Sequence, residues 1–256
     1  MNGINKYEYD LLLKLSEDGD IFAMKNLLSN IINNSNQILD DPNKEKLFKY
    51  LKVLVENNDS DAQLVLGAFY YAGETEFVEQ DYEKAVHYYT ESMNNKTIEH
   101  KYNTDALNNL GYCYYYGRLG EKDYKKAFLH FGKAAFLNHP NAMYKIGDMY
   151  NNGIYIKKDI ETAFYWYKKS YIFSKNDDYI NASVAQRIGK AYIEGEIVEK
   201  DLLKALKYLQ IAERKYYNLA INKPILSNSV YVNKPLNAVT ELLSNVRREL
   251  DKIVNE

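Results

Sequence analysis

Eight of the twelve glycines form four pairs in one repeating frame, and this feature constrains the fold more than any other. Five residues separate the two glycines of each pair. The pairs are Gly67/Gly73, Gly111/Gly117, Gly147/Gly153 and Gly189/Gly195. Self-similarity of this kind is the sequence signature of a repeat protein, in which each unit buries its apolar face against its neighbours.

Other residues keep the same frame around each pair. In the third copy, Ala142 precedes the first glycine by five residues, Ile146 precedes it directly, and Tyr150 follows it by three. An Asp and, four residues later, an Ala follow the second glycine in every copy: Asp81/Ala85, Asp123/Ala127, Asp159/Ala163 and Asp201/Ala205. Agreement of four copies at this many positions is far more specific than a single glycine motif.

Each copy predicts a pair of helices. Ala142, Ile146 and Tyr150 are four residues apart and therefore lie on one face of a helix. The first glycine lies beside that face and costs about 1 kcal/mol of helix propensity relative to Ala. This cost is tolerable if the missing side chain lets a neighbouring helix approach closely, so the position predicts close helix packing. The second glycine suits a left-handed residue at the helix end, and the Asp suits the N-cap of the next helix.

The pattern resembles the Sel1-like repeat family, which is related to the tetratricopeptide repeats. The third copy matches best, with Gly153, Asp159 and the aromatic pair Trp166/Tyr167 in the family's positions, whereas Thr162 and Val184 depart from its usual Lys and Ala. The resemblance implies an all-α fold, a right-handed α-solenoid of stacked helix hairpins. Some secreted members carry paired cysteines, which this chain lacks, so the penicillin binding of that branch is not expected here.

We expect three parts along the chain. Residues 1–42 would hold N-terminal helices and a degenerate first repeat helix. Residues 43–216 would hold the repeats, and residues 217–256 a loop and a C-terminal capping helix. The four clear copies are expected at about 61–94, 105–137, 141–172 and 181–213.

Both ends show weaker copies of the frame. Ala23 aligns with Ala142, which places Leu28 and Asn34 at the two glycine positions and Asn43 at the capping position. At the other end Pro224 falls on a buried position and stops the repetition, because Pro removes a hydrogen-bond donor and clashes with the preceding turn. Residues 236–253 then predict one last helix.

Composition narrows the class of partner. Thirty-three Lys and Arg balance thirty-five Asp and Glu, for a net charge of −2, which disfavours DNA as a partner. Met1–Asp20 has no basic segment followed by an apolar stretch, and no window approaches the length of a membrane span. Cys113 is the single cysteine and implies no oxidising compartment. The expectation is a cytoplasmic chain, with a monomer as the default.

Candidate chemistry is sparse, and we expect no catalytic residue, no metal and no cofactor. The four histidines lack the spacing of zinc ligands and have no partner cysteines. His130 occupies the position held by Tyr88, Trp166 and Tyr208 in the other copies, which favours a core or boundary role. Cys113 aligns with other apolar residues and reads as a small buried hydrophobe.

What remains is a surface. In related arrays the first helix of each pair lines the concave side. On this frame the exposed residues there are Asn108, Tyr112, Tyr115, Tyr116, Tyr144, Asp148, Asn151, Asn152, Gln186, Lys190 and Glu194, whereas Tyr114 and Tyr150 belong to the core. Tyr and Asn suit recognition, because Tyr offers rigid contact area and Asn adaptable hydrogen bonds. A bias toward A/T-rich codons is the competing explanation for the 26 tyrosines.

The sequence thus favours a non-enzymatic scaffold or adaptor that binds a protein or peptide on a concave surface, as the family resemblance also implies. Two alternatives stay open. One is an enzyme of the hydrolase type that uses scattered acidic residues in a groove. The other is a helical repeat that binds RNA through Tyr and Lys.

Overall fold

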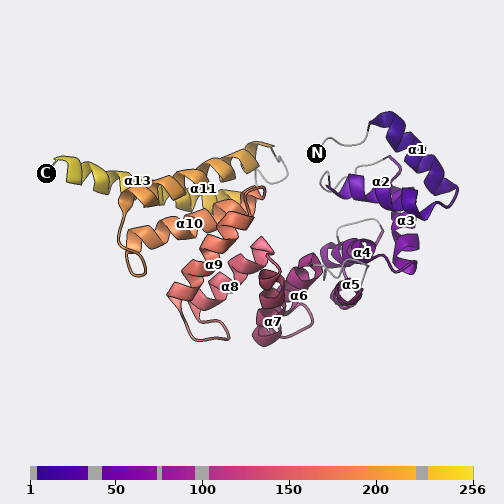
Figure 1. Ribbon diagram of the computed structural model, residues 1–256, viewed down its shortest axis with the longest axis horizontal. Helices are drawn as coiled ribbons and strands as arrows, with labels where there is room; N and C mark the ends of the chain where they lie inside the picture. The colour runs from indigo at the N-terminus through magenta and orange to yellow at the C-terminus, as the bar shows by residue number, and fades with distance from the viewer. Residues whose placement is uncertain (1–4, 34–41, 74–76, 96–103, 223–229, 256) are drawn as a thin grey trace. The chain divides into compact units, whose positions relative to one another are not determined.

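The computed structural model describes residues 5–33, 42–73, 77–95, 104–222 and 230–255. Within these ranges it contains twelve α-helices and no strand, which confirms the predicted all-α fold (Figure 1). The chain divides into two compact units, Met1–Lys122 and Asp123–Glu256. No helix of the described ranges is both long enough and apolar enough to cross a membrane.

Six helices of the described ranges belong to each unit. The first unit holds α1 (Lys6–Glu17), α2 (Ile21–Asn33), α3 (Lys44–Glu56), α4 (Ser60–Ala72), α5 (Tyr82–Asn94) and α6 (Thr104–Tyr116). The second holds α7 (Tyr124–Phe136), α8 (Pro140–Asn152), α9 (Ile160–Phe173), α10 (Asp178–Glu194), α11 (Leu202–Asn222) and α13 (Val230–Asn255). Helices that follow one another within a unit pack together, as expected for repeats that bury apolar surface locally.

The first glycine of a pair is a site of close helix packing. A Cβ atom on Gly147 would lie 2.6 Å from the ring of Tyr167 and 3.3 Å from the carbonyl oxygen of Ala163. The same relation holds between Gly67 and the ring of Tyr89, at 2.8 Å. The missing side chain therefore lets the second helix of a hairpin rest directly on the first.

The second glycine and the following Asp form the turn between the helices. Gly153 ends α8 in the left-handed region at φ 65°, which L side chains rarely adopt. Asp159 then caps α9, since its side chain accepts from the amide of Thr162 at 3.0 Å. Its own amide donates to the carbonyl of Tyr150 at 3.0 Å, which closes the turn. Both predicted roles are confirmed.

The repeat tyrosines are less buried than the frame predicts. Tyr114 and Tyr150 are half-buried and not core residues. Each lies in the last turn of its helix, beside the interhelix loop, so solvent reaches part of the ring. The ring of Tyr150 still packs edge-on against Phe128, with centroids 5.9 Å apart.

The N-terminal helices follow the degenerate copy in part. Ala23 is buried in α2, as its alignment with the repeat alanines predicts. Asn43 stands at the N-cap of α3, but its amide donates to the hydroxyl of Tyr9 at 3.3 Å and does not cap the helix. Asn34, expected to end the preceding helix, lies outside the described residues.

The C-terminal helices are longer than predicted. α11 continues to Asn222, beyond the expected end of the fourth copy, because Tyr216 and Leu219 extend its buried face. α13 begins at Val230, ahead of the expected start at residue 236, and contains Pro235. Val232 packs into the apolar cluster of this unit, so the first turns of α13 are held by tertiary contacts.

Candidate partner-binding groove

A groove of about 730 Å³ opens within the second unit. Its walls come mainly from α8 and α10, the first helices of two successive hairpins, with side chains of α9, α11 and α13 completing them. The repeat frame explains this placement, because the first helix of every hairpin presents its non-packed face on the same side.

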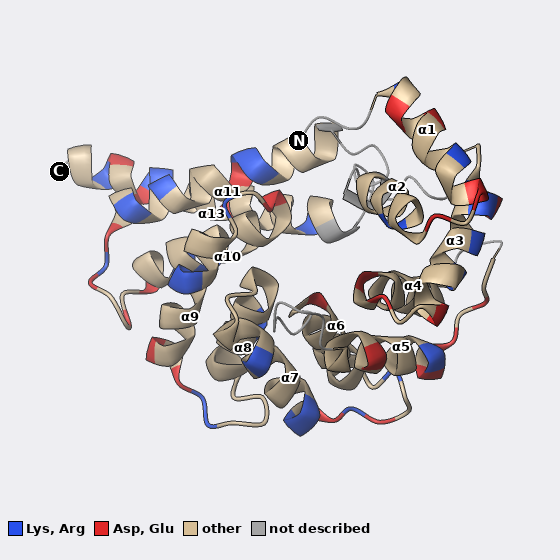
Figure 2. Cartoon of the chain, turned by 45° about the vertical axis from the view of Figure 1, so that its right-hand side comes forward, with Lys and Arg blue, Asp and Glu red and all other residues tan. Residues whose placement is uncertain are grey.

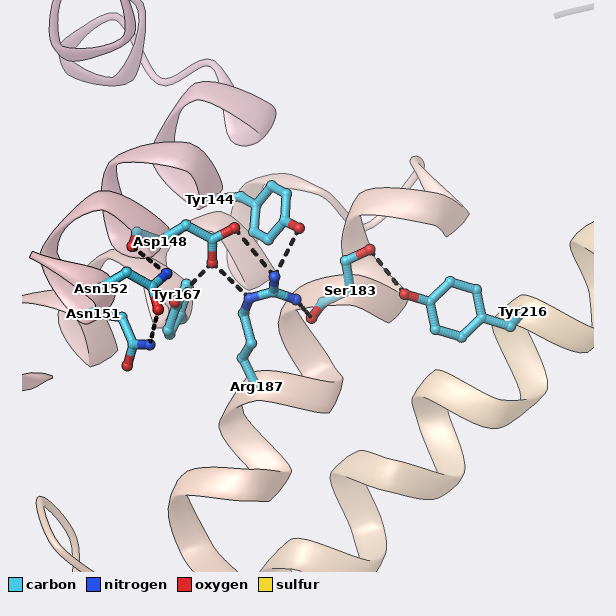
Figure 3. A network of polar contacts seen from close by, with 8 residues as sticks. All are labelled: Tyr144, Asp148, Asn151, Asn152, Tyr167, Ser183, Arg187 and Tyr216. Atoms are coloured by element: carbon cyan, nitrogen blue, oxygen red, sulfur yellow. Dashed lines mark hydrogen bonds and ion pairs between the residues drawn. The ribbon is translucent and has the colours of Figure 1, made fainter. Parts of the chain in front are cut away.

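Arg187 lines the groove and lies at the centre of a network of polar contacts (Figure 3). Its Nε donates to Oδ1 of Asp148 at 2.7 Å and its Nη2 to Oδ2 at 3.1 Å, so the two planar groups pair through two hydrogen bonds. Nη1 donates to the carbonyl oxygen of Ser183 at 3.1 Å. This bidentate pair links α8 to α10, and a guanidinium, unlike an ammonium, has the geometry for it.

Two tyrosines enclose the ion pair. Nη2 of Arg187 also donates to the hydroxyl of Tyr144 at 2.9 Å, and the guanidinium lies 4.5 Å from the centroid of that ring. The hydroxyl of Tyr167 donates to Oδ1 of Asp148 at 2.8 Å. Asp148 therefore accepts from two different side chains, and the charge on each partner is compensated inside the groove.

A second polar contact involves Ser183, one turn before Arg187 in α10. The hydroxyls of Ser183 and Tyr216 share a hydrogen bond of 2.9 Å, and both side chains are buried (Figure 3). This bond ties α10 to α11 beneath the groove. It satisfies two hydroxyls that would otherwise be costly to bury.

Arg187 and three tyrosines of the groove each keep one protonation state at neutral pH. Burial acts to lower the pKa of Arg187, but the adjacent Asp148 carboxylate outweighs it and raises that pKa above its ordinary value. Burial raises the pKa of Tyr144 and Tyr167, and it raises the pKa of Tyr216 to about 12. These groups therefore keep one charge state, which suits recognition better than proton transfer.

Seven of the eleven predicted surface residues line this groove: Tyr144, Asp148, Asn151, Asn152, Gln186, Lys190 and Glu194. Their side chains differ in how open they are. Nδ2 of Asn152 donates to the carbonyl oxygen of Asp148 at 2.8 Å, and Nδ2 of Asn151 donates to Oδ1 of Asn152 at 3.3 Å. Lys190 pairs with Glu194 at 3.3 Å, and both of these side chains are exposed.

Of the eleven residues expected to be exposed, two are buried and five are half-buried: Tyr112, Tyr115, Asp148, Asn151 and Gln186. Tyr144 is only 9% exposed, because Arg187 covers its ring. Asn108 is 5% exposed, since it stands among the buried residues Ala106, Leu107 and Leu110 of α6.

The other four predicted residues all lie on α6 in the first unit: Asn108, Tyr112, Tyr115 and Tyr116. The rings of Tyr112 and Tyr116 stack with centroids 5.9 Å apart, as their spacing of four residues allows. Tyr115 meets Tyr116 edge-on at 5.2 Å. Tyr116 is the most open of these tyrosines, with 46% of its surface exposed.

The sequence pattern did not predict four of the residues that line the groove: Arg187, Tyr167, Ser183 and Tyr216. One signal was available for Arg187. The chain has only five arginines among its thirty-three basic residues, so each Arg is a candidate for a role that needs the planar guanidinium.

Cys113 and His130, for which we expect no chemical role, are buried and half-buried in the fold. Cys113 is buried, and burial raises the pKa of its thiol to about 12, which makes it a poor nucleophile. His130 is half-buried, and burial lowers its pKa to about 4. Within the described ranges, no three His, Cys, Asp or Glu residues gather in an arrangement that could hold a metal ion.

Helix hairpins closed by left-handed glycines and capped by aspartates define this chain as a helical-repeat protein of the α-solenoid class. The Sel1 repeat profile matches residues 60–92, 104–139, 140–171 and 183–217, which together make up just over half of the chain. The chain therefore belongs to the Sel1 repeat family, as its sequence pattern predicted.

Known proteins support this assignment. The crystal structure of a Sel1 repeat protein from Oxalobacter formigenes superposes with a TM-score of 0.62 at 22% identity, covering 90% of this chain and 88% of that one. That of c5321, a protective antigen of uropathogenic Escherichia coli with an SLR fold, gives 0.64 at 24% identity, covering 93% of this chain and 48% of that one. At this identity both likenesses establish the fold alone.

A curated relative is similar over part of this chain. It is the ERAD-associated E3 ubiquitin-protein ligase component HRD3B of Arabidopsis thaliana, 29% identical over 117 residues. That stretch covers 45% of this chain but only 17% of the relative. This chain therefore spans less than a fifth of the length of that relative.

Proposed function

We propose that this protein is a non-enzymatic scaffold that binds a protein or peptide partner on its concave surface, and that the groove around Arg187 takes the partner. Sel1 repeats typically serve as protein-interaction scaffolds. The observation that carries the proposal is the convergence of seven predicted recognition residues on one groove. A cytoplasmic location and a monomeric state belong to the same proposal.

The groove chemistry favours an extended peptide segment. The amide of Gln186 makes no hydrogen bond to any described residue, so it can donate to and accept from a peptide main chain. Tyr179, 36% exposed, lines the same groove. Arg187 and Asp148 already neutralise each other, so the pair forms a rigid surface of the groove and does not have to bind the partner. A rigid surface beside the open amide of Gln186 lowers the entropic cost of binding.

The enzyme alternative finds less support. Among the three carboxylates that line the groove, Asp148 pairs with Arg187 and Glu194 pairs with Lys190. A hydrolase would need two carboxylates held apart with different proton affinities. The RNA alternative needs a basic stripe, whereas Figure 2 shows Lys and Arg interspersed with Asp and Glu along the helices of each unit.

A site-specific photo-crosslinker tests the proposal. A benzoyl-phenylalanine at position 186 should capture a partner that the same group at Tyr165, exposed on α9 and outside the groove, does not. The captured protein is then purified and titrated against variants. Gln186→Ala with Asn151→Ala should weaken binding at least about tenfold. Tyr165→Ala should leave it unchanged.

A variant lacking Tyr112, Tyr115 and Tyr116 provides the competing arm. If it loses the partner while Gln186→Ala with Asn151→Ala keeps it, the groove is not the binding site and the α6 tyrosines are. The step from the first to the second copy carries extra residues around 94–103, which form another candidate surface and lie mostly outside the described residues. Capture of the partner by a crosslinker placed in this loop, and not by one at position 186, would also contradict the groove.

A further inference from the structure

Arg118 lies over three tyrosine rings in the first unit. Its guanidinium carbon is 5.4 Å from the ring centroid of Tyr71, 5.1 Å from that of Tyr82 and 5.5 Å from that of Tyr116. These rings come from α4, from the first turn of α5 and from the last turn of α6. Three helices thus contribute one aromatic wall each around a single cation, a geometry that is favourable for Arg.

The guanidinium of Arg118 is held in place, but not all of its N–H groups have a described hydrogen-bond acceptor. Nε donates to the hydroxyl of Tyr71 at 3.1 Å. Among the described residues, no carboxylate forms an ion pair with Arg118, and its side chain is exposed. Within the described part of the chain no group accepts from Nη1 or Nη2, so this edge can pair with an external acceptor.

The backbone turn at Gly117 fixes the position from which the side chain of Arg118 extends. Gly117 takes a left-handed conformation at φ 67° after the end of α6, and the amide of Arg118 donates to the carbonyl oxygen of Cys113 at 2.9 Å. This closed turn aims the residue back over its own helix. Arg118 thus starts from a defined point, and the three rings reduce the entropy that a ligand must remove.

Arg118 is particular to this hairpin. The residue after the second glycine is Ile154 in the next copy and Glu196 in the last. In a chain with five arginines, two of them, Arg118 and Arg187, stack on tyrosines. Arg187 already holds a carboxylate in its fork, whereas Arg118 presents the same fork with no described carboxylate partner.

We infer that Arg118, held by Tyr71, Tyr82 and Tyr116, is a binding site for an Asp or Glu side chain on an acidic segment of a protein partner. One planar guanidinium matches one planar carboxylate in shape and charge. A phosphate carries nearly two charges and is normally recognised by clusters of arginines. This site lies in the first unit and is independent of the groove in the second.

Peptide arrays with a central Glu and varied flanks, amidated at the C-terminus, test the inference with the full chain. Identical arrays with Gln at the centre are the control. We expect the Glu arrays to retain protein above the Gln arrays. The best Glu peptide, labelled with fluorescein, is then titrated by anisotropy against the unmodified chain and its variants.

Arg118→Lys keeps the charge but loses the fork and the stacking, so it should weaken the peptide at least about tenfold. Arg214→Lys, an exposed arginine on α11, is the matched control and should bind like the unmodified chain. Tyr71→Phe removes the acceptor of Nε and should weaken binding by a smaller factor. Thermal melts of all three variants should match that of the unmodified chain.

Two results would overturn the site. One is equal binding of Glu and Gln peptides. The other is an Arg118→Lys variant that binds as tightly as the unmodified chain or as Arg214→Lys. The groove variant Gln186→Ala separates the two proposals, because loss of the Glu peptide in that variant would move the carboxylate site to the second unit.

Discussion

Arg187 and Asp148, 39 residues apart in the sequence, form a bidentate ion pair in which Nε and Oδ1 are 2.7 Å apart and Nη2 and Oδ2 are 3.1 Å apart. The pair joins α8 to α10 across the intervening helix α9. Successive hairpins of a repeat protein usually meet through apolar contacts. Here a polar contact adds a fixed register between two of them, and the candidate groove is built on it.

The first prediction concerns this pair. Arg187→Met should lower the free energy of unfolding by about 2–4 kcal/mol, because it leaves the carboxylate of Asp148 without its charged partner. Asp148→Leu alone should cost a similar amount for the reciprocal reason. Urea denaturation of both variants and of the double variant gives the coupling energy.

The double variant should recover at least about 1 kcal/mol relative to the sum of the single changes, since neither charge is then left behind. A coupling near zero would mean that solvent screens the pair. The side chains of Arg187 and Asp148 are 31% and 15% exposed, so that outcome is a real test.

The second prediction uses two glycines inside helices. Gly147→Ala should destabilise the chain by about 1–3 kcal/mol, because the new Cβ would lie 2.6 Å from the ring of Tyr167. Gly132→Ala in α7 should stabilise it by about 0.5–1 kcal/mol, because nothing lies within 4 Å of a Cβ there and Ala is the better helix former. Thermal or urea unfolding of both variants would distinguish these signs. Destabilisation of equal size at both positions would contradict the packing role of Gly147.

The third prediction is a pH dependence that arises from His130. Burial, with smaller contributions from Lys133 and Lys126, lowers its pKa from the ordinary 6.5 to about 4. As the pH falls below about 6.5 the unfolded chain binds a proton that the folded chain does not, so stability decreases until about pH 4 and this group contributes no further change below it.

The loss should be on the order of 1–2 kcal/mol after allowance for the partial exposure of His130. His130→Tyr, which installs the residue of the equivalent positions 88 and 208, should flatten the slope between pH 6.5 and 4. Urea unfolding at several pH values measures it. An unchanged slope in this variant would assign the pH dependence to other groups.

The fourth prediction separates core from surface tyrosines. Tyr167→Ala should cost about 3–5 kcal/mol, because it removes a buried ring that packs on Gly147 and donates to Asp148. Tyr116→Ala should cost less than about 1.5 kcal/mol, since nearly half of that ring's surface is exposed and its contacts include neighbouring aromatic rings and Arg118 at the surface. Comparable melting temperatures for the two variants would contradict the assigned burial.

Local features of the fold were predictable from the sequence. The left-handed turn at Gly153 and the cap at Asp159 each involve residues within a few positions of each other. Their geometry therefore follows from the local residue types. The groove was partly predictable for the same reason. Residues 144, 148 and 152 are four apart, and helix periodicity alone puts them on one face.

The contacts that complete the groove were decided only by the tertiary structure. Arg187 reaches Asp148 from another hairpin, so this contact depends on the rotation between stacked hairpins. Ser183 meets Tyr216 within one hairpin, but across 33 residues, so no local pattern reveals that contact. The burial of Asn108 and the extra length of α11 likewise follow from what packs beside them. The repeat pattern fixes the structure within each hairpin, because those interactions are local, whereas the angle at which hairpins stack is set by side-chain volumes that no periodic pattern encodes.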